Sequence, residues 1–212
     1  MSQFFCIEGM DGSGKSTQIN LLLEELGRRG VQAMRIREPG GTEISEKIRS
    51  LILSPSSGKM SSVTELMLYN AARAQLIHEV IAPALAAGKV VVADRFAWST
   101  IAYQGYGRNL DLGMIDALIN IAVGDCWPRH TFVLDIPVDV FQARAAKEGR
   151  ELDRMEQEKN EFFERVRTGY QAIASRDPAR FTLIDGTRSQ MAIQKEIADK
   201  VLFELERPED SL

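Results

Sequence analysis

Short apolar runs alternate along the whole chain with longer segments of helical periodicity. The apolar runs predict five strands, at residues 4–8, 31–38, 89–94, 130–136 and 180–185. Between them, apolar positions recur three and four residues apart, which indicates helices that each bury one face. These helices are predicted at residues 15–30, 42–53, 63–88, 110–124, 139–148 and 189–205, with another inside the charged segment 149–175. The alternation predicts an α/β fold, in which helices cover both faces of a five-stranded parallel sheet.

No repeat and no low-complexity linker interrupts this alternation. We therefore expect residues 1–212 to form a single domain. In parallel sheets of this kind, ligands bind outside the carboxyl ends of the strands. The functional residues are accordingly expected in the turns that follow residues 8, 37, 94, 136 and 185.

Composition and charge narrow the classes of function. The net charge of −4 gives no support for nucleic-acid binding, which usually requires a basic face. No basic segment followed by a long apolar run begins the chain, and no apolar stretch reaches the ~18 residues of a membrane span. We expect a cytoplasmic protein without membrane or nucleic-acid partners, in which Cys6 and Cys126 are reduced.

Residues 9–16, GMDGSGKS, fit the pattern G-x-x-x-x-G-K-[ST] between a predicted strand and a predicted helix. In such a loop the backbone N–H groups surround a phosphate, and the helix N-terminus adds positive potential. Lys15 is expected to reach the β- and γ-phosphates of ATP, and the Ser16 hydroxyl to bind Mg²⁺. The loop residues assigned to ATP are Gly9, Met10, Asp11, Gly12, Ser13, Gly14, Lys15, Ser16 and Thr17. The loop indicates triphosphate binding but no particular reaction, since switches, motors and kinases all use it.

Asp94 and Arg95 follow directly on the third predicted strand. An acid beside a phosphate loop is well placed to bind Mg²⁺ or its water shell, and Arg95 is expected to point into the same cleft. The alternative is a surface ion pair at the start of a helix. The D-x-x-G and N-K-x-D patterns typical of GTPases do not stand at useful places in the sequence.

Two further groups of side chains suit a flat base and a sugar. Tyr69 and Arg73 are four residues apart and therefore share one helical face, although such pairs are also common on half-buried helices. Downstream of Arg95, Gln104 can pair with a base or ribose and Tyr103 can flank a sugar. An ordinary helix end with a half-buried Tyr103 is an equal alternative.

A basic segment, residues 143–158, follows the fourth strand and its helix. Its cations are Arg144, Lys147, Arg150 and Arg154. Such a run is usually a solvated helix face, but here it can close over the phosphate cleft, with Gly149 as a hinge. If two phosphorylated molecules react, each pair of unit charges ~4 Å apart repels by about 4 kcal/mol at an effective dielectric near 20, so cations are required. We place this lid at about 144–156, where closure would also exclude water.

Five segments together resemble thymidylate kinase of the bacterial type, with arginines in the lid. They are EGMDGSGKST, REPGGTEISEKIRSLIL, AARAQL, DRFAWSTIAYQG and GRELDRMEQE, in family order over essentially the whole chain. The resemblance implies a P-loop fold like that of nucleoside-monophosphate kinases. It also implies transfer of the γ-phosphate of ATP to dTMP with Mg²⁺, for dTTP synthesis, and a homodimer. A kinase for another nucleotide or nucleoside is the nearest alternative, and a P-loop nucleotide-binding switch is an alternative of another class.

The resemblance also implies a role for each substrate-binding residue. These residues are Asp11, Glu38, Pro39, Arg49, Tyr69, Arg73, Arg95, Ser99, Tyr103 and Gln104. Asp11 corresponds to the carboxylate near the 3′-hydroxyl of dTMP, and Pro39 lies against the thymine. Tyr69 stands where the family usually stacks a Phe on the base, so its hydroxyl requires a polar partner such as Asn70 or water. Arg73 corresponds to the residue that reads a thymine carbonyl.

The resemblance assigns the remaining groups to phosphate transfer. Arg49 and Arg95 correspond to ligands of the acceptor phosphate, while Ser16 and Asp94 keep the assignment to the metal that the loop pattern and the strand end give them. The catalytic residues implied are Lys15, Arg95, Arg150 and Arg154. Ser13 stands where the eukaryotic form has a catalytic arginine, which leaves that task to the lid. The loop 185–190, with Arg188, corresponds to the adenine site.

Overall fold

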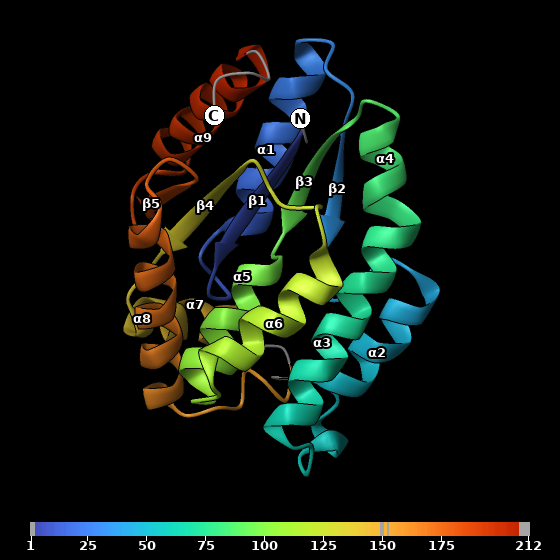
Figure 1. The fold of residues 1–212 in the computed structure, drawn as a ribbon. Helices are drawn as coiled ribbons and strands as arrows, with labels where there is room; N and C mark the ends of the chain where they lie inside the picture. Colours follow the sequence, from blue (N-terminus) through green and yellow to red (C-terminus); the bar gives the residue numbers. More distant parts are fainter. Residues whose placement is uncertain (1–2, 149–150, 152, 208–212) are drawn as a thin grey trace.

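A computed structural model of the protein describes residues 3–148, 151 and 153–207 (Figure 1). Its strands are β1 Phe4–Gly9, β2 Ala33–Arg37, β3 Val90–Asp94, β4 His130–Asp135 and β5 Phe181–Asp185. They form one sheet in the order β2-β3-β1-β4-β5, and every pair of neighbours is parallel. Every residue of β1 and β3 is buried, as expected for central strands with helices on both faces. The predicted five-stranded parallel sheet is confirmed.

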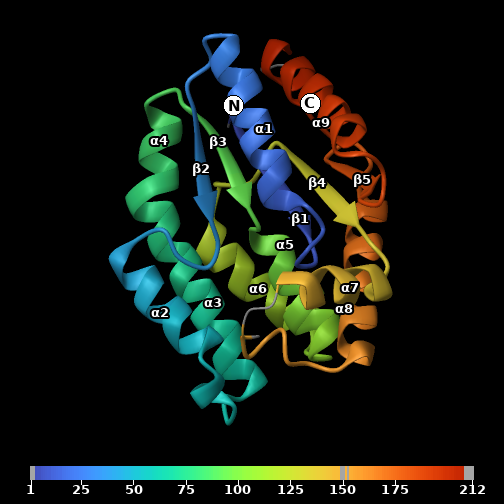
Figure 2. The ribbon, with the colours of Figure 1, turned by 180° about the vertical axis from the view of Figure 1, so that it is seen from behind.

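Helices cover the sheet on both faces (Figures 1 and 2). On one face lie α1 Lys15–Arg28 and α9 Gln190–Glu206, whose apolar side chains pack on β1, β3 and β4. The other face carries α3 Ser62–Leu76, α5 Ala97–Thr100, α6 Leu112–Val123 and α8 Asn160–Arg176. In the part of the chain that the structure describes, no helix has both the length and the apolar character needed to cross a membrane.

The long helix predicted over residues 63–88 is present with a change of register. It runs as α3, a π-helical turn η2 Ile77–Ile81, and α4 Ala82–Ala86. The π turn lies immediately before Pro83, which has no N–H to donate to the carbonyl four residues back.

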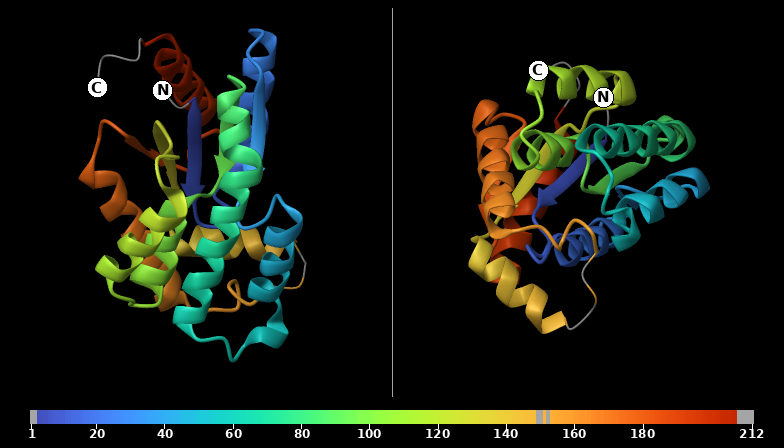
Figure 3. Two further views of the ribbon diagram at one scale, coloured as in Figure 1. Left: turned by 45° about the vertical axis from the view of Figure 1, so that its right-hand side comes forward. Right: turned by 90° about the horizontal axis from the view of Figure 1, so that it is seen from below.

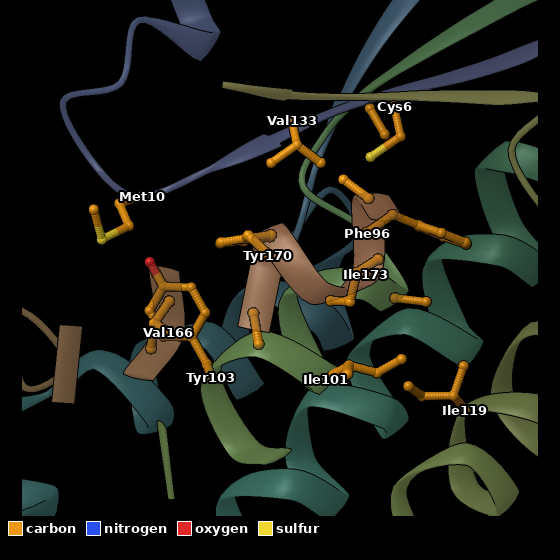
Figure 4. Packing of buried hydrophobic residues seen from close by; sticks show 14 of the residues in the cluster. Cys6, Met10, Phe96, Ile101, Tyr103, Ile119, Val133, Val166, Tyr170 and Ile173 are labelled. Carbon is orange, nitrogen blue, oxygen red and sulfur yellow. The ribbon is translucent and has the colours of Figure 1, made fainter. Parts of the chain in front are cut away.

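The helical segment after Arg95 was not among the predicted elements. Residues 97–107 form α5 and a π-helical continuation, η3 Ile101–Gly107, and η3 packs against α8. Most of η3 is buried, so no polar face marks a helical period in its sequence. Figure 4 shows this region, where Tyr103 and Tyr170 lie within the larger apolar cluster beneath the sheet.

All strands point in the same direction, so their carboxyl ends meet at one edge of the sheet. Figure 3 (right) looks onto this edge, with α2 Glu43–Leu53 and α7 Val138–Glu148 on either side of it. A short 3₁₀ turn, η1 Pro55–Ser57, follows α2. The turn after β1 and the turn after β3 lie close together here, because β1 and β3 are paired along their length.

Candidate active site

The loop between β1 and α1 takes a conformation that requires glycine. Gly9 has a φ of 138°, and a Cβ on it would stand 2.5 Å from the carbonyl oxygen of Leu134 on the neighbouring strand. Gly14 precedes α1 with a φ of 97°, in the left-handed region that side chains rarely adopt. The backbone therefore turns sharply into the helix, and the N–H groups at the start of α1 face the loop.

Lys15 is the first residue of α1 and its side chain folds back over the loop. Nζ donates a hydrogen bond of 2.9 Å to the Met10 carbonyl and lies 3.8 Å from Asp11 Oδ1. Burial and the nearby positive charge of Arg95 lower the pKa of Lys15 to about 8, while Asp11 and Asp94 oppose that shift. At neutral pH the ammonium form dominates, and it lies where a bound phosphate chain would pass.

Ser16 and Asp94 meet at the outer side of this loop. Ser16 Oγ donates to Asp94 Oδ2 at 2.9 Å, which brings a hydroxyl and a carboxylate together. Both are hard oxygen donors, and Mg²⁺ commonly uses one or two such protein oxygens, completed by phosphate oxygens and water. The donor set therefore fits Mg²⁺. Among the described residues, no three or more His, Cys, Asp or Glu side chains gather into a metal site.

Arg35 contacts the same two side chains, and sequence reasoning missed it. Its Nη2 lies 2.6 Å from Asp94 Oδ2 and 2.9 Å from Ser16 Oγ. The side chain comes from β2, which pairs with β3 in register so that Arg35 lies beside Val92. The available signal was a basic residue within the predicted strand at residues 31–38.

Arg95 links the phosphate loop to the interior. It has a φ of 68°, unusual for a residue with a side chain, and its side chain is 14% exposed. Nη2 donates to Asp11 Oδ1 at 2.7 Å and to the Tyr103 hydroxyl at 3.2 Å, and Nη1 donates to the Tyr170 hydroxyl at 3.0 Å. Burial opposes the charge, but Asp11 and the two tyrosines raise the pKa of Arg95 above its ordinary value. The predicted cleft residues Asp11, Arg95 and Tyr103 are thus brought together.

A buried carboxylate, Glu8 on β1, holds the turn that carries Arg95. Glu8 Oε1 accepts from the backbone N–H groups of Phe96 at 2.8 Å and Ser99 at 3.1 Å. Oε2 accepts from the Ser99 hydroxyl at 2.6 Å and the Tyr170 hydroxyl at 2.9 Å. Sequence reasoning missed Glu8 as a functional residue, although an acid in the apolar run FFCIEG was a visible signal.

The phosphate loop, Arg35 and Asp94 line one pocket, and a second pocket opens beside it. The second pocket is lined by predicted residues from five parts of the chain, among them Pro39, Tyr69, Arg73, Ser99 and Gln104. The structure therefore brings the predicted base and sugar residues into one cavity.

Arg73 is fixed in this pocket by a buried ion pair. Its Nε donates to Glu38 Oε2 at 2.9 Å, and the two side chains are 1% and 5% exposed. Asn70 Oδ1 and Thr100 Oγ1 accept from its other nitrogens at 3.0 and 2.9 Å. Burial raises the pKa of Glu38 to about 7, against the effect of Arg73. The suggested partnership of Asn70 with the Tyr69 hydroxyl is not found, because the Asn70 amide instead bonds Arg73 and the Leu66 carbonyl.

Arg49 on α2 lies between the phosphate-loop pocket and the second pocket. Its Nη1 donates to the Pro39 carbonyl at 3.0 Å, and the residue borders both the second pocket and the phosphate loop. Asp11, Glu38 and Arg95 also line both. Cations therefore stand at the boundary where two anionic ligands would face each other.

Gln104 and Arg154 both bond to Glu65 on α3, which the sequence did not single out. Gln104 Nε2 donates to Glu65 Oε1 at 2.7 Å, and Arg154 Nη2 donates to Glu65 Oε2 at 2.6 Å. Arg154 is 9% exposed, and its Nε also donates to the Ile52 carbonyl at 2.6 Å. Arg154, which was expected to be a lid cation, is therefore buried and bonded to Glu65 and to the Ile52 carbonyl.

The remaining lid and adenine residues are placed as follows. Arg144 donates to the carbonyls of Gly12 at 2.7 Å and Gly186 at 3.3 Å, and so joins the phosphate loop to the predicted adenine loop. Arg188 in that loop pairs with Glu196 at 2.6 Å. Arg150 lies outside the described residues.

The protein is a P-loop kinase of the nucleoside-monophosphate type. Three features define this class: the parallel sheet in the order β2-β3-β1-β4-β5, the phosphate loop after β1, and the second, cationic pocket beside that loop. The thymidylate kinase family model matches residues 7–197. The chain belongs to the thymidylate kinase family, as the sequence resemblance predicted.

Individual relatives agree with this membership. A thymidylate kinase of Pseudomonas syringae pv. tomato is 48% identical over 202 residues, which are 95% of this chain and 95% of the relative. Another, from Pelotomaculum thermopropionicum, is 44% identical over 203 residues, 94% of each chain. The crystal structure of a thymidylate kinase from Ehrlichia chaffeensis superposes with a TM-score of 0.76 at 35% identity, covering 95% of this chain and 98% of that one.

Proposed function

We infer that the chain transfers the γ-phosphate of ATP to dTMP, giving ADP and dTDP. The observation that carries this assignment is the continuity of the two pockets. The phosphate loop borders one, Tyr69, Arg73 and Gln104 line the other, and Asp11, Arg49 and Arg95 line both. A switch that only holds a nucleotide has no need of a second anion site beside the phosphate loop.

The reaction requires alignment and charge stabilisation more than acid–base chemistry. An oxygen of the dTMP phosphate, already anionic near neutral pH, attacks the γ-phosphorus, while the bond from that phosphorus to the β–γ bridging oxygen breaks and ADP leaves. Lys15 binds the β- and γ-phosphates, and Arg49 and Arg95 bind the acceptor phosphate. Mg²⁺ bound with ATP at Ser16 and Asp94 would supply further neutralisation of the phosphate charge.

Recognition of dTMP is assigned to the second pocket. The buried ion pair with Glu38 holds Arg73 so that its guanidinium can address a thymine carbonyl. Tyr69 and Pro39 flank the base, and Tyr103 lies beside the sugar, where it disfavours a 2′-hydroxyl. Ser99 and Gln104 also line the second pocket.

The lid is proposed to comprise about residues 144–156, as part of a single domain over residues 1–212. Arg144 and Arg150 are its candidate phosphate ligands, and the contacts of Arg154 with Glu65 and Ile52 support a positioning role for that residue. ATP would extend from the loop residues Gly9 to Thr17 toward the 185–190 loop, with Arg188 near the adenine.

We further propose a homodimer working in the cytoplasm. Exposed apolar residues on two packed helices support the dimer: Met67 on α3 is 55% exposed and Ile121 on α6 is 81% exposed.

The proposal is tested by an acceptor panel with ATP and Mg²⁺, in which ADP release is coupled to a spectroscopic readout. The kcat/KM for dTMP should exceed that for UMP, dCMP, dGMP and dAMP, and Lys15→Ala should abolish turnover while leaving the circular dichroism spectrum unchanged. Equal kcat/KM for UMP and dTMP would reject the role of Tyr103, and a preference for a purine acceptor would reject the assignment of the second pocket.

A further inference from the structure

Arg35 places a positive charge on the two side chains assigned to magnesium. One nitrogen, Nη2, donates to both Asp94 Oδ2, at 2.6 Å, and Ser16 Oγ, at 2.9 Å. The other terminal nitrogen, Nη1, donates to Asn20 Oδ1 at 3.2 Å. The guanidinium therefore connects β2, the start of α1 and the end of β3.

Arg35 and a magnesium ion would both bind the same two oxygen atoms, Ser16 Oγ and Asp94 Oδ2. A metal bound by Ser16 takes a lone pair of Oγ, and the carboxylate of Asp94 then faces the metal or its water shell. A guanidinium on Asp94 Oδ2 uses the same negative charge and repels a divalent cation close by. Arg35 and Mg²⁺ are therefore alternative counter-ions for one carboxylate oxygen.

The position of Arg35 allows such an exchange. β2 is the edge strand of the sheet, and the Arg35 side chain is 32% exposed, whereas that of Asp94 is 10% exposed. The Arg35 side chain can move toward solvent while the strand keeps its pairing with β3. Asp94 is held within the sheet by the register of β3 with both neighbours.

We propose that Arg35 is an exchangeable counter-ion of the magnesium site. It holds Ser16 and Asp94 in their mutual orientation, and it leaves Asp94 when the Mg²⁺–nucleotide complex binds. Because the ion pair with Arg35 must break first, Arg35 raises the Mg²⁺ concentration that the enzyme requires. This inference rests on the proposed assignment of Ser16 and Asp94 to the metal.

The test measures nucleotide binding without turnover. ADP is titrated calorimetrically into wild-type protein and Arg35→Met over a series of MgCl₂ concentrations, and the Mg²⁺ concentration giving half of the maximal gain in ADP affinity is determined. The half-saturating Mg²⁺ concentration should fall by about fivefold in Arg35→Met, since a partly exposed ion pair contributes up to about 1 kcal/mol. An unchanged or raised half-saturating concentration overturns the proposal.

Three further variants make the result unambiguous. Arg35→Gln repeats the charge loss with a polar side chain, in case Arg35→Met does not fold. Arg28→Met removes the same charge from the end of α1, where the side chain is 72% exposed and pairs with Glu25, and it should leave the Mg²⁺ dependence unchanged. Ser16→Ala should lose most of the gain from Mg²⁺; if it keeps the full gain, the metal assignment itself has failed.

Discussion

Burial of a single side chain sets the charge state of the phosphate-binding lysine. Because the pKa of Lys15 is lowered to about 8, mainly by burial, the free enzyme loses this ammonium as the pH rises through that value. The kcat/KM for ATP, which reports on the enzyme before ATP binds, is therefore expected to decline by about tenfold for each pH unit above that value. A pH profile at saturating dTMP measures this decline.

The lowered pKa of Lys15 affects ATP binding and protein stability in opposite directions as the pH rises above about 8. Between about pH 8 and the ordinary lysine pKa of 10.5, the unfolded chain binds the Lys15 proton and the folded chain does not. The contribution of Lys15 to the free energy of unfolding therefore rises with pH over this range. A kcat/KM for ATP that stays constant to one unit above pH 8 would contradict the lowered pKa.

Arg95 is the residue whose loss should separate acceptor from donor. Its guanidinium bonds Asp11, Tyr103 and Tyr170 and borders the second pocket. Arg95→Ala is expected to reduce kcat/KM for dTMP by about 10²- to 10³-fold, the range for a lost charge-stabilising donor, with little change in the KM for ATP. Initial rates at varied dTMP and varied ATP distinguish the two, and an effect confined to the KM for ATP would refute the acceptor assignment.

Residues marked by a local sequence pattern could be predicted, and residues marked only by their distant partners could not. Tyr69 and Arg73 were found because a spacing of four places them on one helical face. Glu8, Arg35 and Glu65 were missed because their partners lie far along the chain and become neighbours only when the sheet and the helices assemble.

At the scale of elements, the strands were predicted because each is a short apolar run, and the amphipathic helices because each has a visible period. The helix α5 and its continuation η3 were missed, since their residues are buried on most sides and follow no alternation of polar and apolar positions. Their position depends instead on an interaction between elements. Glu8 on β1 accepts the N–H groups of Phe96 and Ser99 and so fixes the start of α5 relative to the sheet.

This interaction predicts that Glu8→Gln will affect both folding and acceptor binding. The amide offers one oxygen in place of two and leaves a buried donor of the α5 turn without its charged acceptor, which should destabilise the fold by about 1–3 kcal/mol. Because the turn also orients Arg95, kcat/KM for dTMP should fall by at least about tenfold. Thermal unfolding and steady-state kinetics measure the two effects.

Glu204→Gln is the matched control for that prediction. Glu204 is a buried acid on α9 that accepts from Arg129 Nε at 2.9 Å and lines neither pocket. Its substitution should lower the melting temperature and leave kcat/KM for dTMP unchanged. If Glu8→Gln behaves in the same way, Glu8 is structural only and does not position Arg95.

At the scale of the whole molecule, parallel strands bring the phosphate loop, Asp94 and the second pocket to one edge of the sheet. That convergence follows from the alternation of strands and helices alone, which is why the location of the site could be predicted. The way in which the segment after α7 docks could not be predicted, because it depends on Arg154 reaching Glu65 on α3 and the Ile52 carbonyl on α2.

The outer surface of α3 and α6 supports a last prediction, on assembly. Both helices lie on the same side of the molecule (Figure 1), and each carries an exposed apolar side chain, Met67 on α3 and Ile121 on α6. If this face forms the dimer, wild-type protein should elute with a light-scattering mass near twice 23.7 kDa. The double variant Met67→Asp, Ile121→Asp should elute as a monomer, because two desolvated carboxylates in each half of a symmetric interface are strongly unfavourable. Phe203→Asp, which changes an exposed apolar residue on α9 across the sheet, should leave the mass unchanged; a dimer that persists in the double variant and dissociates in Phe203→Asp would place the interface on α9 instead.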